Sequence, residues 1–384
     1  MNPGRAQPAP TAFSAPIHVT RPLLPPLSDY TELLEGVWQR QWLTNNGELT
    51  QQLERRLEAY LGAPHVAVLG NGTLALQLAL RCFDLAGEVI TTPFTFPATP
   101  HALDSVGIVP VFADIDPQTL TLSPSAVEQA ITPRTSGVLG VHVYGMPCDV
   151  EAIDALAARR GLRVIYDGAH AFGARIGGRS IGDFGDATML SFHATKLFHS
   201  AEGGALLLRR PEDRARIDLL RNFGIRDEVS VVTPGVNAKM NELQAAMGLL
   251  VLDQVEQERA ARARLKAIYT ERFAAAPGLR MFALPDSVSD SNQYAVLLID
   301  ADEAGVDRDT VYERLKAFNI FSRRYFYPLC SEAPHYRDLP SAAPANLPVA
   351  RRISRQVLAL PYFGALGEEG AHRIADAVLH IAGQ

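Results

Sequence analysis

The chain has 384 residues, enough for two or three folding units at roughly 150 residues per domain. Its 47% apolar and 20% charged residues are typical of a globular protein and exclude a mainly disordered chain. The net charge of -6 provides no positive field that would attract phosphate backbones, so nucleic acid is not an expected partner.

The start of the chain and its cysteines indicate the compartment. Residues 1–16, rich in Pro and Ala, lack the apolar run of a secretory signal and are predicted to form a flexible N-terminal arm. No window approaches the ~20 apolar residues that span a bilayer, so no membrane contact is expected. Cys82, Cys148 and Cys330 stand far apart, which favours neither a disulfide framework nor a metal site. We therefore expect a cytoplasmic protein without a metal.

A regular alternation of elements dominates the first half of the chain. Two helices with apolar spacing are predicted over 30–40 and 49–61. Seven short apolar runs follow, separated by turns and helical stretches, at 66–69, 88–92, 109–113, 137–143, 163–166, 187–192 and 205–208. Most of these runs lack polar alternation, as expected for strands covered by helices on both faces of a largely parallel sheet. The pattern predicts a three-layer α/β domain.

The second half of the chain changes character. A long Leu-, Ala- and Gln-rich helix is predicted over 243–265. Beyond it come a strand-like run at 294–299, amphipathic helices at 309–317 and 368–381, and a Pro/Ala-rich surface loop over 333–348. We predict a large α/β domain over 17–250, with the entry helices, and a linking helix plus a smaller α+β domain over 251–384.

The first candidate site is the segment 70–75 (GNGTLA), between the first strand and a helix predicted over 73–82. It matches a dinucleotide fingerprint in form, but that fingerprint needs an acidic residue at a strand end about 20 residues on, and Glu88 begins the next strand. The segment does provide free N–H groups at the positive end of a helix dipole, where a phosphate fits. The alternative is a tight glycine turn capped by Thr73.

The second candidate is Asp167 in the segment 164–170 (VIYDGAH), where an apolar run ends in a carboxylate. Ligands of doubly wound sheets bind at the carboxyl ends of the strands, so Asp167 is expected to point into a crevice. A buried carboxylate there would need a cationic partner. The alternative is that Asp167 caps the following turn.

The third candidate is Lys196 in the segment 190–196 (LSFHATK), which is followed by 202–204 (EGG). Partial desolvation after a strand would lower the pKa of this amine towards a nucleophilic range, whereas the alternative is an exposed lysine. A phosphate cradle, a strand-end carboxylate and a strand-end lysine are together what pyridoxal phosphate requires. Its phosphate needs N–H donors, its pyridine nitrogen an anion and its aldehyde an amine.

These residues resemble the DegT/DnrJ/StrS-type sugar aminotransferases, which have the aspartate aminotransferase fold (pyridoxal phosphate fold type I). The resemblance implies a three-layer α/β large domain with a mostly parallel sheet and a smaller C-terminal α+β domain. It extends from about residue 17 to the C-terminus. The matching segments are 71–76, 92–99, 112–116, 167–174, 191–196 with 202–204, and 235–242.

Catalytic roles for three residues follow from the resemblance. Lys196 is implied to be the Schiff-base lysine, which also carries a proton during ping-pong transamination. Asp167 is implied to contact the pyridine nitrogen of the cofactor. His170 stands where much of the family has Gln near the cofactor's phenolic oxygen.

The resemblance also implies a set of residues that bind the cofactor. Gly72, Thr73 and Ser191 would contact its phosphate, and Phe96 would stack on its ring. Asn237 would reach the phosphate bound by a neighbouring subunit. The implied protein is therefore a homodimer with shared active sites.

The substrate is implied by likeness within the family. Segments 19–26 (VTRPLLPP), 42–47 (WLTNNG) and 221–224 (RNFG) resemble members that transfer the amino group of L-glutamate to C4 of dTDP-4-keto-6-deoxyglucose. The product would be dTDP-4-amino-4,6-dideoxyglucose, for surface polysaccharide or O-antigen biosynthesis. Enzymes that aminate C3 of a dTDP-3-keto-6-deoxyhexose have a similar 191–204 segment, so C3 amination is the alternative. Arg221 and Arg323 are candidates for binding the glutamate carboxylate.

Three other functions agree less well with the sequence. Related dehydratases have His in place of the Schiff-base lysine, so Lys196 argues against dehydration. A regulatory protein without turnover could keep the fold, but all the cofactor positions are filled here. A nicotinamide oxidoreductase is favoured only by segment 70–75.

Overall fold

The computed structural model describes residues 10–383. Its centre is a seven-stranded sheet with the strand order β2-β10-β9-β6-β5-β3-β4, in which only β10 runs antiparallel to its neighbours. The seven predicted runs form these strands: β2 (His65–Leu69), β3 (Glu88–Thr91), β4 (Val109–Phe112), β5 (Thr135–Val141), β6 (Arg163–Asp167), β9 (Ala187–Ser191) and β10 (Gly204–Leu208).

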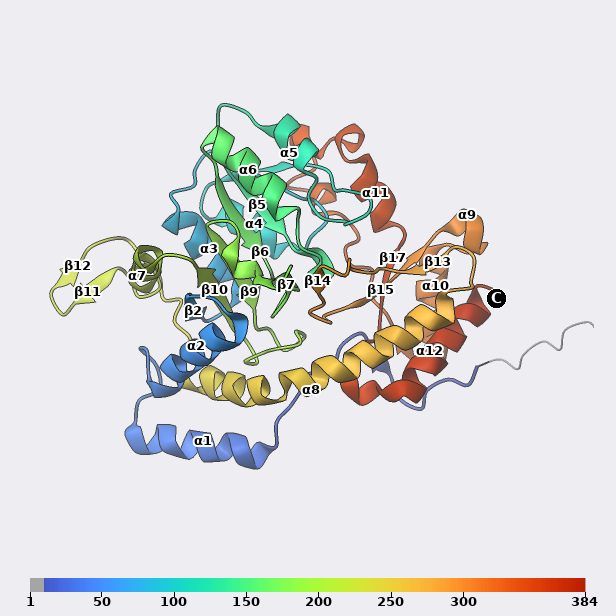
Figure 1. The fold of residues 1–384 in the computed structure, drawn as a ribbon, viewed down its shortest axis with the longest axis horizontal. Helices are drawn as coiled ribbons and strands as arrows, with labels where there is room; N and C mark the ends of the chain where they lie inside the picture. Colours follow the sequence, from blue (N-terminus) through green and yellow to red (C-terminus); the bar gives the residue numbers. More distant parts are fainter. Residues whose placement is uncertain (1–9, 384) are drawn as a thin grey trace, which may run out of the picture.

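Helices cover both faces of this sheet (Figure 1). One face packs on α3 (Gly72–Cys82), α4 (Ala98–Ser105) and α7 (Pro211–Leu220). The other face packs on α2 (Glu48–Leu61), α5 (Pro124–Ala130), α6 (Val150–Arg160) and the first half of α8 (Glu242–Phe273). Successive strand side chains point to opposite faces, so each strand needs apolar residues throughout. The predicted three-layer α/β class is confirmed.

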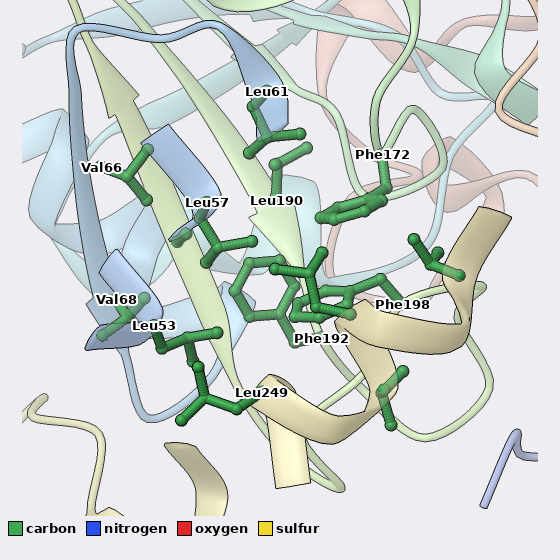
Figure 2. Packing of buried hydrophobic residues seen from close by; sticks show 14 of the residues in the cluster. Leu53, Leu57, Leu61, Val66, Val68, Phe172, Leu190, Phe192, Phe198 and Leu249 are labelled. Carbon is green, nitrogen blue, oxygen red and sulfur yellow. The ribbon is translucent and has the colours of Figure 1, made fainter. Parts of the chain in front are cut away.

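A cluster of buried apolar side chains joins α2 and α8 to the sheet (Figure 2). Leu53 and Leu57 of α2 lie beside Phe192 and Phe198, which flank the turn that contains Lys196. The two phenyl rings meet edge to face, with centroids 4.6 Å apart. Each such buried side chain contributes about 1.5–3 kcal/mol relative to an exposed one. This apolar cluster therefore holds the turn that contains Lys196 in place.

The long helix α8 also completes the start of α2. Gly47, the residue before α2, has no side chain that could cap the helix. Instead, the buried carboxylate of Glu242 accepts hydrogen bonds from the N–H groups of Leu49 and Thr50, both 2.9 Å, and from the Thr50 hydroxyl at 2.6 Å. An acidic group at a helix N-terminus satisfies N–H groups that lack partners and interacts favourably with the dipole.

A smaller α+β unit forms the C-terminal part of the chain. Its antiparallel sheet consists of β13 (Leu279–Met281), β15 (Ala295–Ile299) and β17 (Val357–Leu360). This sheet packs on the second half of α8, on α10 (Arg308–Leu315) and on α12 (Gly367–Ile381), with α9 (Ala301–Ala304) and α11 (Pro348–Ser354) beside it. Because α8 runs unbroken through residue 250, the division between the predicted domains 17–250 and 251–384 stays a prediction.

The N-terminal segment lies on this smaller unit. Residues 1–9 of the predicted arm lie outside the described part of the chain. Within the rest, the Phe13 N–H donates to the Phe318 carbonyl at 3.0 Å, and β1 (Ile17–His18) pairs with β16 (Ile320–Phe321). The chain then crosses to α1 (Leu27–Arg40), which lies along α8 (Figure 1).

Several peripheral features complete the fold. Short strands β7 (Arg175–Ile176), β8 (Arg179–Ser180) and β14 (Val288–Ser289) form a small sheet, and β11 (Ile225–Asp227) and β12 (Ser230–Val231) form a hairpin that projects from the body (Figure 1). The predicted surface loop 333–348 is partly buried, because Tyr336 and Leu347 pack on Phe112 and Cys330. Across residues 10–383, no helix is long and apolar enough to cross a membrane.

Candidate active site

The start of α3 forms the first part of the site. The Asn71 side chain caps this helix by accepting a 2.9 Å hydrogen bond from the Leu74 N–H, so the cap is Asn71 and not, as the alternative interpretation of this segment had it, Thr73. A Cβ atom at Gly72 would lie 3.3 Å from the Ser191 Cβ, which shows how closely the helix start approaches the end of β9. Free N–H groups of a helix start and a serine hydroxyl thus lie side by side, as an anion site requires.

Asp167 ends β6, as predicted, and its carboxylate is buried. Its Oδ2 accepts a 2.8 Å hydrogen bond from the Thr99 hydroxyl, and its Oδ1 accepts one of 3.0 Å from the Ala169 N–H. Burial raises the pKa of Asp167, while these two donors and the Lys196 charge oppose that rise. Within residues 10–383 no cationic side chain lies within 4.0 Å of the carboxylate, so the expected cationic partner is not a side chain of this part of the chain. Neutral donors hold it instead.

Lys196 lies in the turn after β9. The Gln293 side chain fixes this turn, because its Oε1 accepts from the Leu197 N–H at 2.7 Å and its Nε2 donates to the Thr195 carbonyl at 3.1 Å. The Lys196 ammonium lies 6.0 Å from the centroid of the Tyr294 ring. Desolvation lowers the pKa of Lys196 from 10.5 to about 8, and the Asp167 charge acts against that decrease. The amine is therefore able to act as a nucleophile or a base near neutral pH.

His170 follows Asp167 and is almost completely buried. Its Nδ1 accepts a hydrogen bond from the Tyr144 N–H at 3.3 Å. Burial first, and the charge of Lys196 second, lower the pKa of His170 well below its ordinary value. The imidazole is thus neutral in this site.

One cavity of about 270 Å³ brings most of these residues together. Its lining includes every predicted cofactor residue except Asn237: Gly72, Thr73, Phe96, Asp167, His170, Ser191 and Lys196. Asn237 lies outside this lining, in a short backbone pairing with Asn222. The Phe96 side chain is 57% exposed, so it is available to stack on a ligand.

The donor set of this cavity fits pyridoxal phosphate. Gly72, Thr73 and Ser191 offer hydrogen-bond donors for a phosphate, Asp167 offers a carboxylate for a ring nitrogen, and Lys196 offers an amine for an aldehyde. A larger cleft of about 790 Å³, lined by Asp114 among others, contains none of the predicted residues. The Asp114 carboxylate there already accepts hydrogen bonds from the Val349 and Ala350 N–H groups at the start of α11.

The arginines suggested for substrate carboxylates lie elsewhere. Arg221 is buried and donates to Glu54 at 2.7 Å and to the Val68 carbonyl at 2.8 Å. Arg323 is exposed and pairs through its backbone with Ala359. Neither belongs to the cavity lining, and no arginine of residues 10–383 does.

The structure adds residues that the sequence did not indicate. Thr99 lies in the segment 92–99 that resembles the family, but only its hydrogen bond to Asp167 shows what it does. Tyr294, Tyr325 and Phe326 reach the cavity from the smaller unit. No sequence signal marks them, because their place depends on how that unit packs against the large sheet.

Comparisons with known proteins agree with this geometry. Residues 28–379 match the DegT/DnrJ/EryC1/StrS aminotransferase family. A dTDP-4-amino-4,6-dideoxy-D-glucose transaminase of Escherichia coli is 42% identical over 368 residues, which cover 94% of this chain and 98% of that protein. The transaminase of the same name from Shigella dysenteriae is 40% identical over 367 residues, 95% of this chain and 99% of that protein.

A solved structure shows the same fold. The crystal structure of DesI in the presence of its TDP-sugar product superposes on this chain with a TM-score of 0.93 at 40% identity. The match covers 97% of this chain and 94% of that one. The similarity thus includes both the large sheet and the smaller unit.

Proposed function

We propose, from the premise that the chain belongs to the DegT/DnrJ/EryC1/StrS aminotransferase family, that it transfers the amino group of L-glutamate to C4 of dTDP-4-keto-6-deoxyglucose. Glutamate leaves as 2-oxoglutarate, and the keto sugar becomes dTDP-4-amino-4,6-dideoxyglucose. The enzyme is a pyridoxal phosphate-dependent sugar aminotransferase. The observation that carries the choice of substrate is the 42% and 40% identity to two transaminases with this product, over nearly the whole chain.

Pyridoxal phosphate, when bound, withdraws electrons from the substrate carbon that loses a proton. Gly72, Thr73 and Ser191 would bind its phosphate, and Phe96 would stack on its ring. The Asp167 carboxylate, oriented by Thr99 and Ala169, would hold a proton on its ring nitrogen.

Lys196 is the residue that accepts and returns the proton of the substrate carbon. With a pKa of about 8, its Nζ can take a proton from the substrate carbon and give it back near neutral pH. Tyr294, Tyr325 and Phe326 lie around the cavity and limit the access of water. The amine at position 196 also argues against the dehydratase alternative.

We propose a homodimer in which Asn237 completes the site of the partner. Two observations support this proposal. First, large apolar side chains are exposed on α1 and on the β11–β12 hairpin, including Trp38 at 61%, Val229 at 93% and Val231 at 70%, and such surface is typical of an interface. Second, glutamate and a nucleotide-linked sugar are anionic, yet the cavity lining within residues 10–383 contains no arginine. A second subunit is one source of the cationic side chains that such anionic substrates need.

The product is proposed to serve surface polysaccharide or O-antigen synthesis in the cytoplasm. The cytoplasm is a reducing compartment, and this proposal is supported by three buried free thiols, Cys82, Cys148 and Cys330.

An assay with dTDP-4-keto-6-deoxyglucose and L-glutamate tests the function. We expect 2-oxoglutarate and an amino sugar in equal amounts, with nitrogen on C4 as located by NMR. A dTDP-3-keto-6-deoxyhexose should be used poorly. Preferential amination of the 3-keto sugar would establish the C3 alternative, and no amination of either sugar would overturn the proposed substrate class.

A further inference from the structure

Gln293, just before β15 of the smaller unit, reaches the turn of the large domain that contains Lys196. Its side chain is 2% exposed and does not belong to the cavity lining. Its Oε1 accepts from the Leu197 N–H at 2.7 Å, and its Nε2 donates to the Thr195 carbonyl at 3.1 Å. A single side chain therefore binds the main chain on both sides of Lys196, although Leu197 and Gln293 are 96 residues apart in the chain.

The side-chain amide of Gln293 matches both of its partners. The Leu197 N–H needs an acceptor and the Thr195 carbonyl needs a donor, and an amide offers one of each. Among residues 10–383, no other residue of the smaller unit forms a hydrogen bond with the segment 193–197. A buried main-chain group without a partner is unfavourable. Loss of this amide should therefore release the turn from the smaller unit.

The residue before Gln293 is held by a buried polar network. Asn292 has a φ of +54°, in the left-handed region that Asn adopts more often than most residues. Its Oδ1 accepts from the Tyr362 hydroxyl at 2.8 Å, and its carbonyl accepts from Nη1 of Arg262 at 3.3 Å. Arg262, in the second half of α8, is buried and pairs with Glu258 at 2.7 Å. Buried networks whose members have partners are rigid, so Gln293 projects from a fixed base in the smaller unit.

The position of Lys196 determines how much water its amine meets. The ammonium lies 6.0 Å from the centroid of the Tyr294 ring, and Tyr294 is the residue that follows Gln293. The titratable groups that line the cavity with Lys196 come from the end of β6, from the segments around the turn and from the smaller unit: Asp167, His170, His193, Glu202, Tyr294 and Tyr325. Desolvation among them is the largest influence on the pKa of Lys196, and the Asp167 charge comes second. A displaced turn would therefore change the protonation of this amine.

We propose that Gln293 is a positioning residue, which keeps the Lys196 amine in the desolvated part of the cavity by holding the two residues on either side of it. The smaller unit thereby sets the position of an amine that belongs to the large domain. The use of this amine in transamination rests on the proposed function. If Gln293 only joined the two units, its loss would lower stability but leave the titration of Lys196 unchanged.

Acylation of Lys196 in the full-length, cofactor-free protein by a small uncharged reagent tests the proposal. Gln293→Met keeps the length of the side chain but lacks the amide donor and acceptor. Water should then reach Lys196, and because desolvation is what lowers its pKa to about 8, that pKa should rise. We expect the inflection of the acylation profile to move up by about one pH unit, which lowers acylation at pH 7 about tenfold. In the same variant, hydrogen exchange of the peptide that contains Leu197 should become faster.

Ser291→Ala is the matched control. Ser291 lies in the same segment, but its hydroxyl donates to the His170 carbonyl at 2.6 Å and not to the Lys196 turn. Its acylation profile should match that of the original protein. An unmoved inflection in a folded Gln293→Met, or an equal shift in Ser291→Ala, would overturn the proposal. Thermal unfolding shows whether Gln293→Met folds. If it does not, Gln293→Asn replaces it, because its shorter amide cannot reach both partners and should move the inflection in the same direction.

Steady-state kinetics of the cofactor-loaded enzyme provide a second measurement. In Gln293→Met we expect kcat to fall about tenfold or more, because the amine is displaced, while KM for L-glutamate stays within about threefold, because Gln293 does not line the cavity. A raised KM at unchanged kcat would contradict the assigned role. The acylation profile needs neither cofactor nor sugar. A shifted profile together with a failed sugar assay would therefore overturn only the proposed function.

Discussion

The hydroxyl of Thr99, in α4, donates a 2.8 Å hydrogen bond to Oδ2 of Asp167, at the end of β6. This bond joins two segments that are 68 residues apart in the chain. Hydrogen bonds to a carboxylate favour its charged form, so Thr99 keeps the pKa of Asp167 from rising further with burial. The negative charge of Asp167, which is proposed to contact the ring nitrogen of the cofactor, thus depends on the uncharged side chain of Thr99.

Replacing Thr99 by Val should therefore impair the enzyme without unfolding it. The pKa of Asp167 would rise, and its carboxylate would be protonated more often at neutral pH. We expect kcat/KM to fall about tenfold or more, the usual effect of losing a hydrogen bond to a charged group. Thr99→Ser keeps the hydroxyl and should stay within about threefold. If both variants lost the same activity, the hydroxyl would not be the cause.

Asp167→Asn should retain the fold and lose most of its turnover. An amide cannot hold a proton on the ring nitrogen, so the cofactor would no longer withdraw electrons well. Binding through the phosphate should persist, and the visible absorption of the cofactor reports it. Turnover close to that of the original enzyme would remove Asp167 from the mechanism.

The reactivity of Lys196 should depend on pH in a defined direction. Only the free amine is nucleophilic, and desolvation lowers the pKa to about 8, so acylation of the cofactor-free protein by a small uncharged reagent should rise through pH 8 and then level off. In Asp167→Asn the charge that supports the ammonium is gone, so the inflection should move to lower pH. Mass spectrometry of the Lys196 peptide measures both profiles. An inflection that moved upward in this variant would contradict the assigned electrostatics.

Glu242→Ala should lower the free energy of unfolding by about 1–3 kcal/mol, since it leaves the Leu49 and Thr50 N–H groups of α2 without a partner. Glu368→Ala is the matched control, because Glu368 also lies in the first turn of a helix, α12, but is exposed. Its effect should stay within about 0.5 kcal/mol. Urea unfolding measures both variants, and equal losses would mean that Glu242 does not act as the cap.

Mixed dimers test whether the site is shared. Lys196→Ala and Asn237→Asp disable different parts of the site, so each homodimer should be inactive. If Asn237 acts on the partner, a heterodimer of the two contains one intact site and should recover up to half of the activity. Differently tagged subunits allow the heterodimer to be purified. No recovery in verified heterodimers would mean that Asn237 serves its own subunit or none.

The large sheet could be predicted from the sequence because each strand is buried on both faces. Runs such as those at β2 and β10 are continuously apolar, and the polar residues that end β6 and β9 then share one edge of the sheet. Because these residues share one edge, the sequence alone predicted that Asp167 and Lys196 lie at one site. The capping residue of α3 was harder to predict, because Asn71 and Thr73 are both suitable types and only the geometry selects Asn71.

The rest of the site depends on long-range packing that leaves no local pattern. Phe326 reaches the cavity from the smaller unit, about 130 residues after Lys196, because β16 and β17 position its segment. Similarly, Glu242 of α8 caps the N-terminus of α2. No local pattern marks this contact, because the residue before α2 is Gly47, which has no side chain. Strands as short as β1 and β7 are also too brief to show a period.

Reduction of the cofactor-loaded enzyme with borohydride tests the central claim most directly. The treatment fixes the cofactor to the amine that binds it, and digestion with mass spectrometry identifies the labelled peptide. The account predicts the pyridoxyl label on Lys196, with neither label nor turnover in Lys196→Ala. A pyridoxyl label on any other lysine would contradict it.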